Sequence, residues 1–159
     1  MPSHLLEPPA GSVPPISYTR KLALAKARLV AKRVKEGLVL GADTVVVHRG
    51  RIFTKPTDFA DACRILYALQ GTTHRVITAV AVVDARTGRE KVDHALSRVT
   101  MRSLEPQEIA RYAKRHLDKA GAYAAQEKKD PVVVKIVGSY TNVVGLPLEV
   151  VRELLKKFS

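Results

Sequence analysis

The chain is organised around one stretch, Glu36-Gly37-Leu38-Val39-Leu40-Gly41-Ala42-Asp43-Thr44-Val45-Val46-Val47. Its two apolar runs, 38–40 and 45–47, are typical of a strand that is buried on both faces. Between them lies Asp43, whose charge is costly to bury unless it is paired, hydrogen-bonded or bound to a metal. The small residues beside it leave room for a ligand to approach the backbone. Asp43 could be a structural residue that caps a neighbouring loop, or a general base or metal ligand in a pocket, and we favour the second interpretation.

Length and residue usage indicate one folded domain. A chain of 159 residues is long enough for a sizeable core. Its first residues lack the basic and apolar regions of a signal peptide, and no apolar run approaches the length of a membrane span. Cys63 is the single cysteine, which excludes an internal disulfide and favours a reducing compartment. We therefore expect a cytoplasmic protein with no membrane partner.

The formal net charge of +12 favours an anionic partner. Nucleic acid, a membrane surface and a phosphorylated small molecule all fit this charge. Thermophile proteins also carry many charges and few amides, and Asn142 is the only asparagine here, so the charge alone decides nothing. Aromatic residues make up 5% of the chain and do not alternate with basic residues as a base-stacking surface requires. We therefore expect no nucleic-acid partner.

The order of the predicted elements indicates an α/β class. Residues 1–17 are rich in proline and are predicted to form an extended arm, and residues 18–159 are predicted to form a single domain. The polar segment 116–131 lies between two elements and is predicted to carry function. Helices that alternate with strands, together with a hairpin at Arg49-Gly50, predict a mixed sheet. The expected helices are 18–35, 58–70, 106–115 and 147–158, and the expected strands are 38–47, 51–53, 73–84, 91–102 and 132–137.

Five segments of the sequence together carry a family resemblance. They are Leu40-Gly41-Ala42-Asp43-Thr44-Val45-Val46, Lys55-Pro56 before Asp58 and Asp61-Ala62, Thr72-Thr73-His74-Arg75-Val76-Ile77-Thr78, Asp118-Lys119-Ala120-Gly121-Ala122-Tyr123 with Gln126, and Gly138 to Leu148. In this order and spacing they resemble the Maf proteins, nucleoside triphosphate pyrophosphatases once named as septum-formation inhibitors. One segment alone would be a weak signal, but five in register are hard to produce by chance. The resemblance covers roughly Lys21 to the C-terminus.

This resemblance implies a fold and an activity. Maf proteins have an elongated, twisted mixed sheet flanked by helices, with a central cleft, and their fold is similar to that of inosine triphosphatases. They split a nucleoside triphosphate between the α and β phosphates, which gives a nucleoside monophosphate and pyrophosphate. The reaction uses a divalent metal, so Mg²⁺ or Mn²⁺ is the implied cofactor.

The resemblance also implies roles for single residues. Asp43 matches the family's proton acceptor, and it is also the residue that we expect to bind the metal. Thr44 and Gln126 match positions tied to base selection, and an aspartate followed by threonine resembles the branch that acts on dTTP and UTP. Lys26 and Lys55 match lysines that face the phosphates. General chemistry agrees, because a carboxylate can accept the proton of an attacking water, and lysines stabilise charge on leaving pyrophosphate.

The chain departs from the family pattern at its start. Maf proteins begin with a strand and a Ser-x-Ser-x-x-Arg loop that grips the phosphates, and this chain lacks that segment. Loss of the arginine removes a bidentate phosphate contact that lysine cannot copy, so we expect weak activity. The alternative function is a catalytically weakened nucleotide-binding regulator of the same fold, linked to cell division.

The missing first strand also predicts an open sheet edge beside residues 38–47. An open apolar edge presents unpaired backbone N–H and C=O groups, which invite pairing with another chain. The prolines of residues 1–17 make that segment a poor replacement for a central strand, because each proline removes a hydrogen-bond donor. We therefore expect self-association, such as a homodimer.

Overall fold

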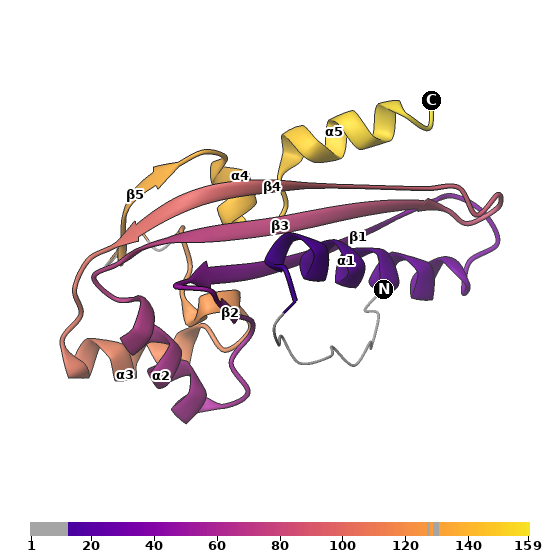
Figure 1. The fold of residues 1–159 in the computed structure, drawn as a ribbon. Helices are drawn as coiled ribbons and strands as arrows, with labels where there is room; N and C mark the ends of the chain where they lie inside the picture. Colours follow the sequence, from indigo (N-terminus) through magenta and orange to yellow (C-terminus); the bar gives the residue numbers. More distant parts are fainter. Residues whose placement is uncertain (1–12, 127, 129–130) are drawn as a thin grey trace.

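The computed structural model describes residues 13–126, 128 and 131–159, which form a sheet with helices around it (Figure 1). In this part of the chain, none of the helices combines the length and the apolar character that crossing a lipid bilayer requires. The elements in chain order are α1 (Pro15–Ala31), β1 (Leu38–His48), β2 (Arg51–Phe53), α2 (Phe59–Leu69), β3 (Thr73–Asp84), β4 (Glu90–Met101), α3 (Pro106–Arg115), η1 (Ala120–Ala122), β5 (Val133–Val137), α4 (Tyr140–Val144) and α5 (Leu148–Lys156).

α1 and α4 differ most from their sequence predictions. α1 begins at Pro15, inside the predicted arm, because a proline ring suits the first helical position, where no hydrogen bond is lost. The part of the predicted arm before Val13 lies outside the described residues. A segment predicted as a turn forms the short helix α4. Ser139 caps it by accepting a hydrogen bond from the N–H of Asn142, and Gly145 ends it in the left-handed conformation.

The five strands form one sheet in the order β2-β1-β3-β4-β5, and every neighbouring pair is antiparallel. The prediction of a mixed sheet is therefore wrong for the described strands. Alternating helices and strands are typical of parallel crossovers. Here α2 instead follows the edge strand β2 and returns the chain on the other side of β1, as an antiparallel neighbour. The predicted α/β class, a sheet flanked by helices, is confirmed.

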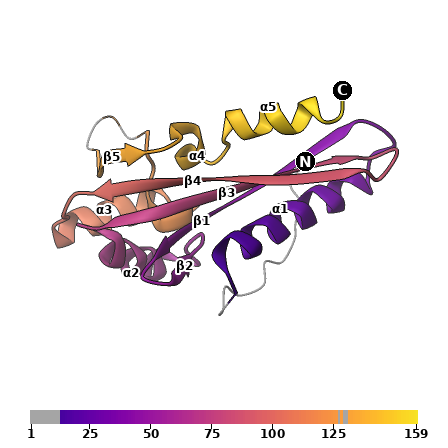
Figure 2. The same ribbon diagram turned by 45° about the horizontal axis from the view of Figure 1, so that its top comes forward.

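α1 and α5 lie on opposite sides of the sheet (Figures 1 and 2). α1 packs on β1 and β3 through small side chains that include Ala23 and Ala27. α5 contacts the other face through Leu154, which packs on Val80 and Val82 of β3. Because side chains alternate between the two faces of a strand, neighbouring residues of β1 and β3 belong to different layers of the core.

The largest core cluster joins α2 and α3 to the end of the sheet near β2. Asp58 begins α2 by accepting a hydrogen bond from the N–H of Asp61 at 2.8 Å. α2 buries one of its faces in this cluster, and α3 contributes Tyr112 and Ala113 to it. The strands contribute Val46, Val76, Val99 and Met101 to the same cluster.

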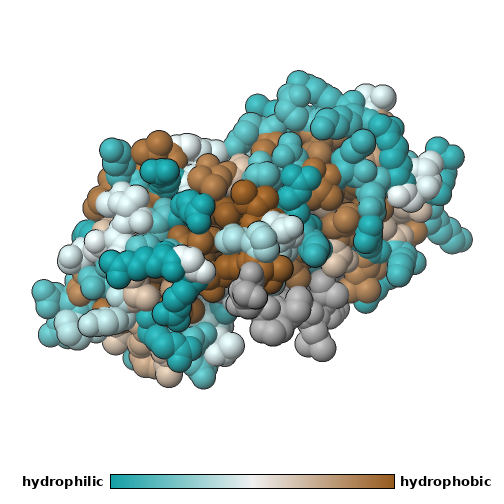
Figure 3. Space-filling view, in the orientation of Figure 1, coloured by the Kyte–Doolittle hydropathy of each residue, from teal (hydrophilic) through white to brown (hydrophobic). Residues whose placement is uncertain are grey.

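Among the described strands, only β3 pairs with the first half of β1, so one edge of that half carries no described partner. It pairs with β3 from Leu38 to Val47, but with β2 only from Val46 to His48. Leu38 and Leu40, predicted to be buried, are 46% and 39% exposed, because they lie on the face of β1 opposite α1 and no described strand covers this edge. Hydrophobic residues also reach the surface in the middle of the view in Figure 3, between more hydrophilic ends. Self-association along this edge stays a prediction.

Substitution Gly41→Ala should destabilise the fold by forcing α1 away from β1. A Cβ atom at this position would lie 2.5 Å from the carbonyl oxygen of Ala23 and 2.8 Å from the backbone nitrogen of Ala27. Neither atom can move without the helix, so we expect the free energy of unfolding to fall by about 1–3 kcal/mol, as measured by urea denaturation. Gly88→Ala is the control for backbone strain alone, because no atom lies within 4 Å of a Cβ atom there and only its φ of +76° makes alanine unfavourable. A smaller loss at Gly41 than at Gly88 would contradict the close packing.

Candidate active site

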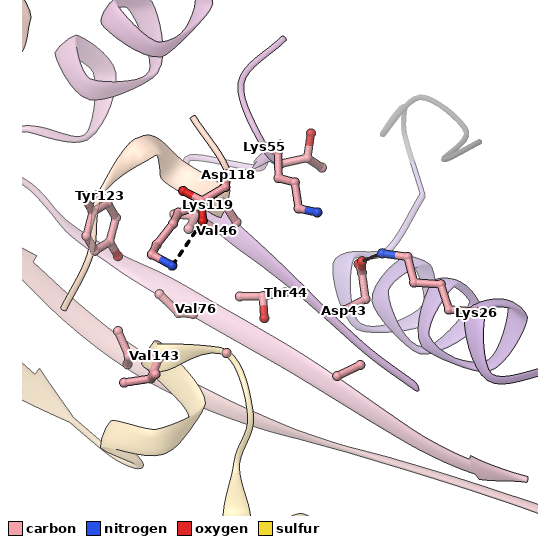
Figure 4. A pocket seen from close by; sticks show the side chains of 15 residues that line it. Lys26, Asp43, Thr44, Val46, Lys55, Val76, Asp118, Lys119, Tyr123 and Val143 are labelled. Atoms are coloured by element: carbon pink, nitrogen blue, oxygen red, sulfur yellow. Dashed lines mark hydrogen bonds and ion pairs between the residues drawn. The ribbon is translucent and has the colours of Figure 1, made fainter. Parts of the chain in front are cut away.

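A cleft opens where β1 passes between α1, the η1 segment and the end of α4 (Figure 4). Neighbouring residues of a strand point to opposite faces, and both Asp43 and Thr44 reach the cleft because it lies at the edge of β1 that no described strand covers. Figure 4 shows Asp43 beside Lys26 on one side of Thr44, with Lys119 on the other. The described lining residues are Lys26, Ala42, Asp43, Thr44, Val46, Thr54, Lys55, Val76, Asp118, Lys119, Ala120, Tyr123, Val143, Val144 and Gly145.

Asp43 and Lys26 form an ion pair in the cleft, with 2.5 Å between Oδ1 and Nζ. Their side chains are only 7% and 16% exposed, so each charge compensates for the burial of the other. The close contact of α1 with Gly41 sets this geometry, since Ala23 and Ala27 touch Gly41 and Lys26 lies between them on the helix. The result is a buried carboxylate beside a cavity, in a position to accept a proton or to bind a metal ion.

Two further lysines line the same cleft. Lys55 follows β2 and is exposed, and Lys119 precedes η1, where its Nζ lies 3.5 Å from Oδ2 of Asp118. Together with Lys26, these lysines give the described lining three ammonium groups against two carboxylates, those of Asp43 and Asp118. The excess of positive charge suits an anionic ligand that carries several charges.

Four of the five predicted site residues, namely Lys26, Asp43, Thr44 and Lys55, meet in this cleft. The fifth, Gln126, lies in a turn, is exposed and is not among the lining residues. It follows Tyr123 on the segment that forms one wall of the cleft. Its role in base selection stays a prediction.

Sequence reasoning did not assign Asp118, Lys119 or Tyr123 to the site, nor the backbone of 143–145 at the end of α4. A signal was available for the first three, because they belong to the polar segment 116–131 that was predicted to carry function. The backbone of 143–145 lies in the family segment Gly138 to Leu148, but α4 was predicted as a turn because it is only five residues long.

The described residues offer few ligands for a metal ion. No cluster of three or more His, Cys, Asp or Glu side chains is found among them. Asp43 and Asp118 are the two carboxylates among the described lining residues. This donor set fits Mg²⁺ or a similar hard cation, which is commonly held by one or two carboxylates, waters and the phosphates of a substrate.

Tyr123 is anchored to the sheet by a buried histidine. Thr72 donates its hydroxyl proton to the carbonyl oxygen of Leu69 at 2.8 Å, so it accepts a hydrogen bond from Nδ1 of His74 at 3.1 Å. Nε2 of His74 then accepts from the Tyr123 hydroxyl at 2.8 Å. Burial lowers the pKa of His74 to about 4, with a smaller effect from nearby His48, and burial raises the pKa of Tyr123. Neutral His74 therefore fixes this wall of the cleft.

The free energy of unfolding should decrease as the pH falls from 6.5 toward about 4. In this range His74 of the unfolded chain takes up a proton that the folded chain excludes, so acid favours unfolding. The separation of the two pKa values corresponds to on the order of 3 kcal/mol. Urea denaturation of the wild type and of His74→Gln over this range measures the effect. The carboxylates contribute alike to both proteins. If the free energy of unfolding changed equally with pH in the wild type and in His74→Gln, the role of His74 would be contradicted.

Comparison with known proteins places the chain in a family. The family described as "Maf-like protein" matches residues 1–158, a longer span than the resemblance predicted from Lys21 onward. The chain is 49% identical to a dTTP/UTP pyrophosphatase of Moorella thermoacetica, over 99% of this chain and 82% of the relative. It is 45% identical to a dTTP/UTP pyrophosphatase of Pelotomaculum thermopropionicum, over 96% and 81%. It is 43% identical to a nucleoside triphosphate pyrophosphatase of Xylella fastidiosa, over 91% and 78%. The chain therefore belongs to the Maf-like protein family.

Proposed function

We propose that this chain is a nucleoside triphosphate pyrophosphatase that acts on dTTP and UTP. The observation that carries the proposal is the buried pair of Asp43 and Lys26 at the edge of a cleft whose lining is net positive. A carboxylate and fixed ammonium groups are what hydrolysis of a polyphosphate needs. Family membership and the names of the relatives support the same activity.

In the proposed reaction, a water molecule attacks the α-phosphorus. The water oxygen bonds to that phosphorus, Asp43 takes the water's proton, and the bond from the α-phosphorus to the bridging oxygen breaks. The products are a nucleoside monophosphate and pyrophosphate. Asp43 is suited to this role because it is nearly buried and still borders the cleft.

Lys26 and Lys55 bind the triphosphate and stabilise the charge that moves to the leaving group. Lys26 pairs with the carboxylate of Asp43. In the proposed complex it also contacts the phosphates, so substrate binding weakens the pair and leaves that carboxylate better able to accept a proton. Lys55 is exposed and approaches from the loop after β2, whereas Lys119 lies on the other side of Thr44, on the wall of the cleft that carries Tyr123. Preorganised cations at the two walls stabilise developing charge without reorganising during the reaction.

A divalent cation completes the proposed site. Asp43 would hold it, and Asp118 is a second carboxylate on the lining. When bound, Mg²⁺ or Mn²⁺ supplies positive charge to the phosphate oxygens and lowers the pKa of a coordinated water. The small number of protein donors suits a metal ion that arrives with the substrate phosphates.

Asp43→Asn should lower pyrophosphate release from UTP and dTTP by at least ~10²-fold, because asparagine keeps the shape of the side chain but cannot accept the proton. The assay follows pyrophosphate with Mg²⁺ or Mn²⁺ present. Asp93→Asn is the control, since Asp93 lies on β4 away from the lining residues. Near-normal turnover by a folded Asp43→Asn protein would refute the proposed role. A wild type that binds nucleotide and releases no pyrophosphate would favour the regulatory alternative.

Gln126→Ala should change the order of substrate preference. The glutamine amide offers both a donor and an acceptor, enough to pair with the edge of uracil or thymine. The wild type should cleave UTP and dTTP faster than ATP and GTP, and the variant should lose this ranking. Gln107→Ala, an exposed glutamine on α3, is the matched control. An unchanged ranking in Gln126→Ala would exclude that residue from base selection.

A further inference from the structure

A chain of hydrogen bonds runs from the cleft through the sheet to α4. Thr44 of β1 and Thr78 of β3 are direct cross-strand partners, with 2.9 Å between their hydroxyl oxygens. Thr78 is fully buried, whereas Thr44 is half-buried and lines the cleft. Thr78 in turn donates its hydroxyl proton to the backbone carbonyl oxygen of Asn142 at 3.0 Å.

The direction of this chain follows from the number of protons. A hydroxyl has one proton to donate, and a carbonyl oxygen has none. Since Thr78 gives its proton to Asn142, the bond between the two threonines must use the proton of Thr44. Thr44 therefore has no proton left for a ligand, and it presents only oxygen lone pairs to the cleft.

The position of Asn142 is fixed by its own hydrogen bonds, so its carbonyl oxygen stays in place to accept the proton of Thr78. Its side-chain Nδ2 donates to the carbonyl oxygen of Val76 at 3.1 Å and to Oγ of Ser97 at 2.9 Å. Its backbone N–H donates to Oγ of Ser139 at 3.0 Å. A flipped amide would place Oδ1 against the carbonyl oxygen of Val76, so the arrangement has one orientation. Asn142 is fully buried, and its hydrogen bonds to β3 and β4 fix α4 on the sheet.

Gly145 keeps the Thr44 hydroxyl accessible from the cleft. This glycine has a φ of +118° and lies at the end of α4, and a Cβ atom built on it would be 3.6 Å from Oγ1 of Thr44. A larger side chain would cover the hydroxyl. Figure 4 shows Thr44 in the middle of the cleft, between the Asp43–Lys26 pair and Lys119.

We propose that Thr78 is a positioning residue that makes the Thr44 hydroxyl an obligate hydrogen-bond acceptor, so that the cleft selects a base with an N–H group at this point. The inference rests on the proposed function and names its substrate class more closely. Uracil and thymine carry a proton on N3, whereas N3 of cytosine is an acceptor. A lone-pair oxygen at this point therefore favours UTP and dTTP over CTP, because two acceptors cannot pair.

The test compares kcat/KM for UTP and CTP in the wild type, Thr78→Val and Thr78→Ser. Valine keeps the β-branched shape and removes the hydroxyl, which frees the proton of Thr44. We expect the preference for UTP to fall about fivefold to tenfold, the worth of one hydrogen bond. Serine restores the hydroxyl and should restore the preference. In a Thr44→Val background, Thr78→Val should change the preference no further.

Thr73→Val is the matched control. Thr73 forms the same kind of cross-strand hydroxyl pair, with Thr100 at 2.8 Å, but neither residue lines the cleft. Loss of the Thr73 hydroxyl should leave the preference for UTP over CTP unchanged. Thermal unfolding of each variant separates a loss of fold from a loss of selectivity.

Calorimetry with UMP and CMP measures the same selectivity without turnover. Failure of the wild type to cleave any nucleotide would refute the proposed function, and the binding ratio would still test the role of Thr78. A folded Thr78→Val protein with an unchanged ratio would overturn the inference. An equal loss of activity toward UTP and CTP would also overturn it, because it would show a purely structural role.

Discussion

The structure depends on the contact between α1 and Gly41 of β1, where helix and strand approach too closely for any side chain. This contact places Lys26 against Asp43, and the two buried charges stabilise each other only because the helix cannot move away. Small residues on α1, such as Ala23 and Ala27, continue the close packing along the strand. A glycine and two alanines, with no chemistry of their own, therefore hold the charged pair in place.

Hydroxyl groups that donate their proton to a backbone carbonyl oxygen set the polarity of the cleft. Thr72 gives its proton to a backbone carbonyl, which places a proton on Nδ1 of His74 and directs the hydroxyl of Tyr123 toward Nε2. At the base of the cleft, Thr78 likewise donates its proton to the carbonyl oxygen of Asn142, so the hydroxyl proton of Thr44 points toward Thr78. In both cases the main chain of a neighbouring element determines how a side chain at the cavity is presented, so the fold and the site share one network.

The sequence predicted those parts of the fold and site that depend on local pattern. Lys26, Asp43 and Lys55 lie in segments with clear periodicity or a family motif, and the structure brings all three to the cleft. Strand direction was not predictable in this way, because the alternation of buried residues is the same in parallel and antiparallel pairs. The bond between His74 and Tyr123 joins positions 49 residues apart, and α4 owes its stability to contacts of Asn142 with the sheet. Such long-range contacts leave no periodic signal.

Asp43 and Thr44 are adjacent in the chain but belong to opposite faces of β1. If one residue performs the chemistry and the other selects the base, a substitution at one position leaves the packing layer of the other untouched. Selectivity can then diverge within the family by single replacements while the reaction is retained. An insertion or deletion in β1 would exchange the two faces and lose both properties at once. The geometry thus makes the length of this strand far less tolerant of evolutionary change than the identity of the residue at position 44.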